Sequence, residues 1–521
     1  MKNANVRRMT FAASTALILG ALGSVPLTAS ASPPTPPTNG TGHTLSSNTV
    51  FYVPPAAKGS AEEVAQLIAH GDRPDAGLIR DMEATPQAVW FNGGTAQQVK
   101  QQVRQTLHMA SLQDAVPILV AYNLPGRDCS QYSAGGAPSD VAYQSWISAF
   151  AQGIGSGEAV VILEPDSLAN LPSDCSSAYQ TANPGITDAT READVAYAVN
   201  ALEVDPNVSV YLDGGHSAWQ AVGNIAGPLV AAGVAKAQGF FLDVSNYQYA
   251  TNNVFYGTWV SDCIALGKGS LTYNYAGCPN QYWNGGGPTT SIGEQFGQYN
   301  GVAMSPYGVW SETSTVQDLN TSGIDASFQG LLAGTVPTTH FVIDTSRDGQ
   351  GPNDMEAYYA APYDQPQSVV GSTPGVTYPD NSPPGGSLQN GNWCNPPSSG
   401  TGILPTANTS TIPNSLDSYL PAKTSLLDAY LWVKTPGQSD GQCDLAGGVR
   451  NWQDGPPVGG YGYTPPITGW PASTAAAFKT FDPLWSLQTN SVFTDPAAGA
   501  WFAPEALQLA QLANPTASPG H

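Results

Sequence analysis

Short apolar runs recur along the chain and alternate with amphipathic stretches. Eight of these runs are rich in β-branched and aromatic residues and nearly free of polar side chains, which is typical of strands buried on both faces of a sheet. They comprise residues 49–53, 88–91, 117–122, 159–163, 208–212, 239–244, 340–343 and 429–433. The pattern therefore predicts strands that lie in the core of the protein.

Segments with helical periodicity lie between many of these runs. The stretch 95–98 (TAQQ) resembles a capping box, and Val99, Val103 and Leu107 follow it at four-residue spacing. Two further apolar helical faces comprise Tyr143, Trp146, Ile147 and Phe150, and Val195, Tyr197 and Val199. Alternation of strand and helix over roughly 400 residues predicts a parallel α/β domain, either an open sheet or a closed barrel.

Two long segments break this alternation. Residues 253–300 are rich in Gly, Asn and Tyr, and residues 349–420 are rich in Pro, Gly, Ser and Asn. Loops of this length in a compact domain are usually lids or walls of a functional site. Insertions tolerated on the surface are an equally good interpretation, so both alternatives stay open here.

The first residues have the features of an export signal. A basic start precedes an apolar run over 11–27, and residues 29–31 (ASA) have the small side chains of a cleavage site. The run is short and broken by Gly and Pro, so we predict a cleaved signal and secretion rather than a membrane anchor. The predicted division is a signal peptide over 1–31, a Pro/Thr-rich linker or tail over 32–48, a main domain over 49–515 and a short tail over 516–521.

Charge narrows the possible partners. The 521 residues include 17 Lys and Arg against 39 Asp and Glu, a net charge of −22, so neither nucleic acid nor an anionic membrane is an expected partner. A neutral polysaccharide is compatible with this charge. Six cysteines in an exported chain predict three disulfides, and the lack of a CxxC pair argues against a zinc site.

Acids, amides and bases collect where the apolar runs end. The groups that follow six of the runs are Asn123 to Cys129, Glu164 with Asp166, Asp213 to His216, Ser245 to Tyr247, Asp344 to Arg347, and Lys434 with Asp440. The carboxyl ends of parallel strands form the active rim of a β/α barrel or an open α/β sheet. We therefore expect these side chains to converge on one site.

The chemistry of this site can be narrowed by exclusion. The chain has no HxH or HExxH pair, no GxSxG elbow and no GxGxxG after a strand, so neither a metal nor a dinucleotide cofactor is expected. Paired carboxylates acting on a neutral substrate indicate glycoside hydrolysis. Trp90, Trp219 and Trp393 lie near strand ends and could stack on sugar rings, although each one taken alone fits core packing better.

Eight motifs, in order along the chain, resemble the signatures of glycoside hydrolase family 6, secreted cellulases, in an actinobacterial-like form. They are VILEPDSLANL, YNLPGRDC, YLDGGHSAW, SNYQYAT, FVIDTSRDGQGP, GNWCN, LWVKTPGQSDGQC and DPAAGAWF. The resemblance implies that 49–515 is a catalytic domain, a single distorted β/α barrel of seven to eight parallel strands with long active-site loops. It also implies a monomer that hydrolyses the β-1,4-glucan of cellulose and cello-oligosaccharides with inversion, without a cofactor.

The resemblance assigns roles to individual residues. Asp166 matches the proton donor, Asp128 the aspartate that supports it and helps to organise the attacking water, and Asp440 the proposed base. Tyr122 matches the tyrosine beside the distorted sugar at the cleavage point. The matching substrate contacts are Trp90, Trp219, Trp393, Asp213, His216, Asn246, Lys434 and Gln438, with Arg127 and Arg347 as residues that hold carboxylates in place.

One departure from the family pattern concerns Gln438. The family usually has Glu two positions before the residue that matches Asp440, as in PGESDG, whereas this chain has an amide. An amide can still hydrogen-bond a sugar hydroxyl but carries no charge. A catalytically silent glucan-binding barrel is therefore an alternative, although the presence of Asp128, Asp166 and Asp440 together argues against it.

The resemblance also bears on the disulfides and on the mode of attack. The family has bridges that match Cys129–Cys175 and Cys394–Cys443, and Cys263–Cys278 then remains by elimination. The two long segments favour a roofed site and a cellobiohydrolase, with an endoglucanase as the alternative.

The proposed acid has to hold a proton near neutral pH, yet the pKa of an aspartate in water is about 3.9. Asp166 follows a buried strand and has Asp128 as an expected neighbour, and both burial and a like charge raise the pKa of a carboxyl group. We therefore expect Asp166 to stay protonated while Asp128 is ionised and paired with Arg127. Glu164 is expected to be hydrogen-bonded within the barrel rather than to react.

Overall fold

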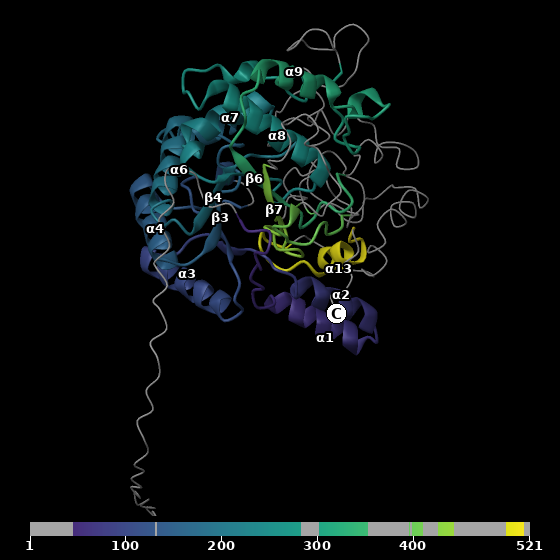
Figure 1. Ribbon diagram of the computed structural model, residues 1–521. Helices are drawn as coiled ribbons and strands as arrows, with labels where there is room; N and C mark the ends of the chain where they lie inside the picture. Colours follow the sequence, from purple (N-terminus) through teal and green to yellow (C-terminus); the bar gives the residue numbers. More distant parts are fainter. Residues whose placement is uncertain are drawn as a thin grey trace, which may run out of the picture. The chain divides into compact units, whose positions relative to one another are not determined.

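A single parallel sheet forms the centre of the domain. The computed structural model describes residues 45–130, 133–282, 302–352, 395, 399–409, 426–441 and 496–514. Within these residues seven strands pair side by side in the order of the chain, β1 to β7 (Figure 1). They are β1 Val89–Phe91, β2 Ile118–Ala121, β3 Ala159–Leu163, β4 Val208–Asp213, β5 Gly239–Leu242, β6 His340–Asp344 and β7 Leu427–Leu431.

Helices connect successive strands and pack around the sheet. The described α-helices are α1 Lys58–Ala69, α2 Arg73–Glu83, α3 Ala96–Ser111, α4 Asp140–Ile154, α5 Ser177–Ala182, α6 Asp188–Leu202, α7 Val222–Ala231, α8 Ala250–Gly267, α9 Ser322–Leu332 and α13 Ala503–Gln511. Short 3₁₀ turns are η1 Asp128–Ser130, η2 Pro172–Asp174, η3 Val234–Lys236, η4 Tyr275–Gly277 and η5 Gln317–Leu319. Neighbours along the chain, α3 with α4, α4 with α6, α6 with α7, α7 with α8 and α8 with α9, lie side by side. No helix in these parts of the chain is both long and apolar enough to cross a membrane.

Both faces of the sheet are apolar because successive side chains of a strand point to opposite sides. One face encloses an inner cluster to which every described strand contributes, namely Trp90, Val120, Ile162, Tyr211, Phe241, Val342 and Ala429. The opposite face, with Leu119 and Val161, packs against helix residues such as Phe150 and Val199. At the two edges, Ala88 donates its backbone N–H to the carbonyl of Trp432 at 2.9 Å. The sheet is therefore curled into a distorted barrel, and the predicted fold class is confirmed.

Seven of the predicted strands are present, but the prediction of a strand over 49–53 is wrong. That segment makes only an isolated parallel bridge, between Phe51 and Val116. Pro54 and Pro55 follow it directly and lack the N–H that a longer ladder needs. Phe51 is buried in the inner cluster of the barrel, so its apolar character serves core packing instead of strand pairing.

The helix predictions are confirmed at α3, α4 and α6. At α3 both bonds of the capping box are present: Gln98 N–H donates to Thr95 Oγ1 at 3.3 Å, and Thr95 N–H donates to Gln98 Oε1 at 2.8 Å. Val99 and Val103 are fully buried. The capping box and the four-residue spacing were sufficient to predict α3 because both depend only on residues close together in the sequence.

The prediction of an irregular segment over 253–300 is wrong at its start, where α8 extends to Gly267. This helix is buried nearly all round, so it shows no amphipathic periodicity. Its polar residues find tertiary partners: Asn252 donates to the carbonyl of Gly308 at 3.0 Å and accepts the N–H of Trp310 at 2.8 Å. Most of the second segment, 349–420, lies outside the described residues.

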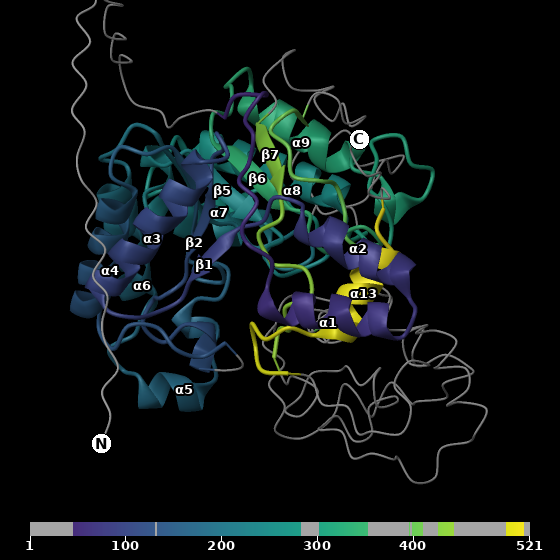
Figure 2. The ribbon, with the colours of Figure 1, turned by 90° about the horizontal axis from the view of Figure 1, so that it is seen from below.

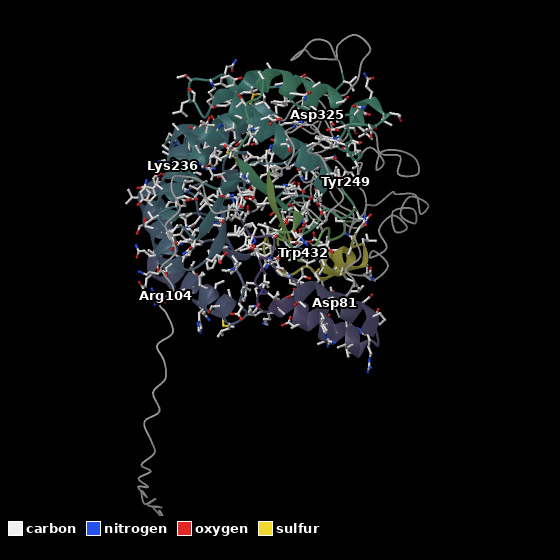
Figure 3. All side chains as sticks on the ribbon, in the orientation of Figure 1. Asp81, Arg104, Lys236, Tyr249, Asp325 and Trp432 are labelled. Atoms are coloured by element: carbon white, nitrogen blue, oxygen red, sulfur yellow. A yellow bond between two sulfur atoms is a disulfide. The ribbon has the colours of Figure 1, made fainter. Side chains whose placement is uncertain are left out.

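Helices α1, α2 and α13 form a cluster that packs against the segment after β7. Helices α1, α2 and α13 lie beside one another in Figures 1 and 2, although α13 comes from the far end of the sequence. Trp432 lies against this cluster (Figure 3), where it packs with Ile79, Met82, Ala506 and Leu507. The cluster therefore attaches the two ends of the domain to the barrel next to β7.

We expect opposite effects from alanine at two glycines. Gly239 in β5 pairs with His340 in β6, and a Cβ there would overlap the carbonyl oxygen of His340. Gly239→Ala should lower the free energy of unfolding by about 1–3 kcal/mol. Gly77 in α2 has no atom within 4 Å of an added Cβ, so Gly77→Ala should raise it by about 0.5–1 kcal/mol. Urea unfolding of both variants checks this, and equal changes would contradict the described register.

Candidate active site

The loops that leave the carboxyl ends of the strands enclose a pocket with a volume of about 360 Å³. Its lining comes from Trp90 in β1 and from the loops that follow every described strand except β6. Of the predicted site residues, those that line it are Trp90, Tyr122, Arg127, Asp128, Asp166, His216, Trp219, Asn246, Lys434, Gln438 and Asp440. The structure thus brings together residues that are more than three hundred positions apart in the sequence.

Two predicted site residues lie behind the pocket, and one cannot be placed. Asp213, expected to contact substrate, does not line the pocket but lies beneath the loop that carries Asp166. Arg347 is buried behind Asp440 and holds that carboxylate, as expected. Trp393 lies outside the described residues.

Asp166 lies at the tip of a strained turn that follows β3. Glu164 and Asp166 have φ angles of 55° and 62°, a region that residues other than glycine rarely adopt. Asp166 is partly exposed to the pocket, whereas Glu164 is buried. Burial, together with the nearby charges of Asp213, Asp128 and Asp440, raises the pKa of Asp166 well above its ordinary value, and Lys434 opposes this in part. The site therefore favours a protonated Asp166.

Glu164 and Asp213 fix the loops of neighbouring strands. Glu164, at the end of β3, accepts the backbone N–H groups of Asn123 and Leu124 after β2, at 2.8 and 3.0 Å. Asp213, at the end of β4, accepts those of Leu168 and Ala169 after β3, at 2.9 and 2.8 Å. Each carboxylate thus positions the loop that follows the preceding strand. The interpretation of Glu164 as a hydrogen-bonded residue of the barrel agrees with these contacts.

Asp344 has the same function at the other side of the barrel. It ends β6 and accepts backbone N–H groups of Val433 and Lys434 at 3.0 and 2.8 Å and of Ser245 at 3.3 Å. One buried carboxylate therefore connects the loops after β5 and β7. This connection places Lys434 at the pocket.

Asp128 is held by its own loop and not, as predicted, by an ion pair with Arg127. Its Oδ2 accepts the backbone N–H of Ser133 at 2.7 Å. Arg127 instead donates to the carbonyl oxygens of Ser133, Asn92 and Tyr122, and it acts on Asp128 through its charge. Burial raises the pKa of Asp128, while the bond from Ser133 and the charge of Arg127 lower it. Backbone carbonyls compete for a guanidinium, and sequence spacing does not show that competition.

Aromatic side chains form one wall beside these acids. The rings of Trp90 and Tyr122 meet edge to face at 5.5 Å, and the guanidinium of Arg127 lies 4.4 Å from the centre of the Tyr122 ring. The indole N–H of Trp90 donates to the carbonyl of Val433 at 2.8 Å. The Tyr122 hydroxyl lies 2.9 Å from Oγ of Ser133. These contacts fix both rings at the edge where β1 meets β7.

Asp440 is a deeply buried anion between two cations. Its Oδ2 lies 2.7 Å from Nη1 of Arg347, and its Oδ1 lies 2.9 Å from Nζ of Lys434. Asn395 adds a backbone N–H to Oδ2 at 2.8 Å. Burial alone would raise the pKa of Asp440, but the charges of Arg347 and Lys434 outweigh it and hold that pKa below the ordinary value. Between these two pKa values Asp440 is therefore ionised while Asp166 keeps its proton.

His216 and Trp219 form another part of the lining, and the centres of their rings are 5.6 Å apart. His216 Nδ1 accepts the backbone N–H of Ala218 at 3.2 Å, and burial lowers the pKa of His216 to about 3, so the imidazole is neutral. Lining residues to which the sequence assigned no role include Asn92, Ser133, Asn170, Ser245, Tyr247, Gln248 and the segment 497–499. Several of them lie in motifs already singled out, such as SNYQYAT, but their side-chain directions needed the fold.

Two of the three predicted disulfides are present. Cys129 is bonded to Cys175, which links the loop of Asp128 to the segment after Asp166, and Cys263 is bonded to Cys278. The predicted pair Cys394–Cys443 lies outside the described residues. Among the residues that the structure describes, no cluster of three His, Cys, Asp or Glu side chains is arranged to hold a metal ion.

Known proteins share this sequence pattern. A sequence profile described as "Glycosyl hydrolases family 6" matches residues 46–461. Endoglucanase 1 of Streptomyces halstedii is 28% identical over 444 residues, which cover 85% of this chain and 95% of that protein. The 1,4-beta-D-glucan cellobiohydrolase C of Emericella nidulans is 26% identical over 415 residues, which cover 76% and 61%. The endoglucanase Cel6 from Mycobacterium tuberculosis, solved with a thio-cellobioside ligand, has a TM-score of 0.48 at 24% identity and covers 89% of this chain and 97% of its own.

The buried carboxylates predict how stability depends on pH. Burial raises the pKa of Glu164 from 4.5 to about 7 and that of Asp213 from 3.8 to about 6. Between the unfolded and the folded pKa of each group, the folded protein keeps a proton that the unfolded chain has lost, so raising the pH favours unfolding. Asp440 has the opposite sign, because its lowered pKa contributes stability that is lost when the pH falls below 3.8. The unfolding temperature should therefore be highest at about pH 4–5 and fall towards neutral pH.

Glu164→Gln provides the matched control for this prediction. The amide oxygen can still accept the N–H groups of Asn123 and Leu124, but the side chain no longer titrates. Calorimetric scans from pH 4 to pH 8 should show a shallower decline for the variant than for the wild type. A wild-type unfolding temperature that rises over this interval would contradict the prediction.

Proposed function

The chain belongs to family 6 of the glycosyl hydrolases, and from this premise we propose that it hydrolyses β-1,4-glucosidic bonds of cellulose and cello-oligosaccharides with inversion. One observation carries the proposal. The same pocket holds Asp166, which is favoured in its protonated form, and Asp440, which is favoured in its ionised form. Pairs of carboxyls with opposite environments are the basis of acid–base glycoside cleavage. Relatives that match over most of this chain are named for cleavage of glucan.

Asp166 is the proposed acid that protonates the leaving oxygen. Its surroundings meet the main requirement, because burial and three neighbouring carboxylates keep the proton on it at a pH where a free aspartate would have lost it. The positive φ of Asp166 and the hydrogen bonds from Leu168 and Ala169 to Asp213 hold the turn in place. The acid is therefore aimed at the pocket by a rigid support.

Asp128 and Asp440 are proposed to act on the attacking water and on the positive charge that develops on the sugar. Asp128 keeps one carboxylate oxygen for the backbone N–H of Ser133, and its place in the pocket lets the other organise water. Asp440 is the proposed base, but both of its oxygens lie in ion pairs, so it is a weak one. We infer that much of its effect is electrostatic, since a fixed anion stabilises an oxocarbenium-like transition state.

Trp90 and Trp219 are proposed to stack on glucose rings. Both are partly buried and line the pocket, and Trp90 is held rigidly by its bond to Val433. Asn246, Gln438 and Lys434 supply polar groups along the same lining. A flat ring with polar groups around its edge is the arrangement that a pyranose can fill.

Inversion can be read directly from the product. A single displacement by water converts the β-linkage into an α-anomer, whereas a covalent intermediate would return a β-anomer. Proton NMR of the first-formed product from cellohexaose distinguishes the two outcomes before the anomers equilibrate.

The mode of attack is the finer part of the proposal. The predicted cellobiohydrolase rested on two long segments as a roof, but the first of them begins as the buried helix α8. An endoglucanase matches over 85% of this chain, and the cellobiohydrolase named above over 76%. We therefore favour endo action, with a cellobiohydrolase as the second candidate.

The remaining proposals concern location and assembly. We propose that the protein is secreted, which the two disulfides support, and that it acts as a monomer. The alternative of a silent glucan-binding barrel is disfavoured, because a pocket needs no set of three carboxylates in order to bind a neutral sugar.

Replacement of the proposed acid gives the direct test. Asp166→Asn should lower turnover on unactivated glucan by at least about 100-fold, because an amide cannot donate a proton to the leaving oxygen. Turnover of a cello-oligosaccharide with a dinitrophenyl leaving group should fall far less, since that group departs without protonation. Glu158→Gln, an exposed change just before β3, is the matched control and should leave both rates unchanged. Near-normal hydrolysis of glucan by Asp166→Asn would refute the assignment.

Endo action predicts a rapid early fall in viscosity. When carboxymethyl cellulose is hydrolysed, cuts within the chain lower viscosity long before many reducing ends appear. We expect this behaviour from the wild-type protein. Release of cellobiose with little early change in viscosity would instead identify a cellobiohydrolase.

A further inference from the structure

The guanidinium of Arg347 is shared between two buried carboxylates. Its Nη1 lies 2.7 Å from Oδ2 of Asp440, which lines the pocket, and 3.4 Å from Oε1 of Glu505, which does not. The exposed fractions of these side chains are 1% for Arg347, 5% for Asp440 and 0% for Glu505. Charges buried this deeply are stable only when they are paired. Each group of the set therefore depends on the others.

Glu505 reaches Arg347 because of how α13 begins. The helix starts at Ala503, and Glu505 is the acidic residue of its first turn. Just before it, Phe502 donates its backbone N–H to the carbonyl of Gly437 at 2.7 Å. Gly437 is also so close to Ala506 that a Cβ would lie 2.6 Å from the Cβ of that residue. The first turn of α13 is thus fixed on the back of the loop that carries Asp440.

The charges of this group balance only when Glu505 is included. Arg347 and Lys434 are the cations, and Asp440 ion-pairs with both of them. Gln438, two positions before Asp440, is neutral and adds no compensating charge. With Asp440 as the single anion, the cluster would have a net positive charge. Glu505 supplies the second negative charge from outside the pocket.

We propose that Glu505 is a positioning residue for the reaction. It fixes Arg347, and because it pairs with the same guanidinium as Asp440, it reduces the effect of the positive charge of Arg347 on the pocket. The inference rests on the proposed function, because it concerns proton donation by Asp166. Extra positive charge in the pocket would favour the ionised form of Asp166, which cannot donate. Glu505 thus helps the acid to keep its proton without touching substrate.

The other charged groups near the cluster set the background for this effect. Those that act on Asp166 are Asp128, Asp213, Asp440 and Lys434, and those that act on Arg347 are Asp440, Glu505 and Tyr247, whose ring centre lies 5.7 Å from the guanidinium carbon. Glu505→Gln removes one charge from this set and leaves the identities of the other charged residues unchanged. Any shift in the titration of the acid then reports on Glu505.

The test compares pH profiles of kcat/KM on cellohexaose for the wild type, Glu505→Gln and Glu83→Gln. Glu83, in α2 of the neighbouring helical cluster, accepts the N–H of Ala57 and makes no ion pair with Arg347 in the described structure. For Glu505→Gln we expect the basic limb to move to lower pH by roughly half a unit or more. At neutral pH kcat should fall several-fold with little change in KM. The profile of Glu83→Gln should keep its shape.

Each outcome decides the matter. If the profile of Glu505→Gln superposes on that of the wild type after correction for the folded fraction, or if Glu83→Gln shifts it equally, the inference is wrong. If Glu505→Gln does not fold, Glu505→Asp replaces it in the test, because the shorter side chain keeps the charge but moves it away from Arg347. This variant should shift the pH profile in the same direction by a smaller amount. No shift would overturn the inference. An inactive wild type would instead refute the proposed function and the inference with it, whereas an active wild type with unshifted variants refutes the inference alone.

Discussion

The hydrogen bonds between buried strand-end carboxylates and the loops of neighbouring strands are the constraint on which the site depends. Glu164 holds the loop after β2, Asp213 the loop after β3, and Asp344 the loops after β5 and β7. Loop backbones near a barrel core have N–H groups that must be satisfied, and a carboxylate can accept several at once. Four of the rim loops are therefore each fixed by a carboxylate at the end of a neighbouring strand.

This arrangement has an electrostatic consequence that serves the chemistry. Carboxylates placed to hold backbone also crowd negative charge around Asp166, and burial raises the pKa values of the group. The same residues that fix the acid in space thus help to keep it protonated. The cost is a folded state that becomes less stable as the pH rises through the range where these groups ionise.

The surroundings of Asp440 in the same pocket have the reverse effect. There Asp440 has to remain ionised in a buried position, and two cations secure it. Because buried cations in turn require anions, the cluster extends outward to Glu505 on α13. The terminal helix is therefore part of the electrostatic structure of the site, and its attachment to α1 and α2 gives that cluster a role beyond packing. The pocket thus holds one carboxyl favoured in its protonated form and one favoured in its ionised form, each with its own partners.

The sequence by itself determined the elements, the rim and the residue types of the site. Buried strands show as continuous apolar runs, and the capping box at Thr95 is local, so seven strands and helices α3, α4 and α6 could be predicted. The ordered motifs indicated the family and assigned Asp128, Asp166 and Asp440 to one site. Only the tertiary structure decided what each polar group binds. Asp213 binds the backbone of the loop that carries Asp166, Arg127 binds the carbonyl of Asn92, and Glu505 pairs with Arg347. Such partners are distant in sequence, so packing sets them and they leave no local pattern.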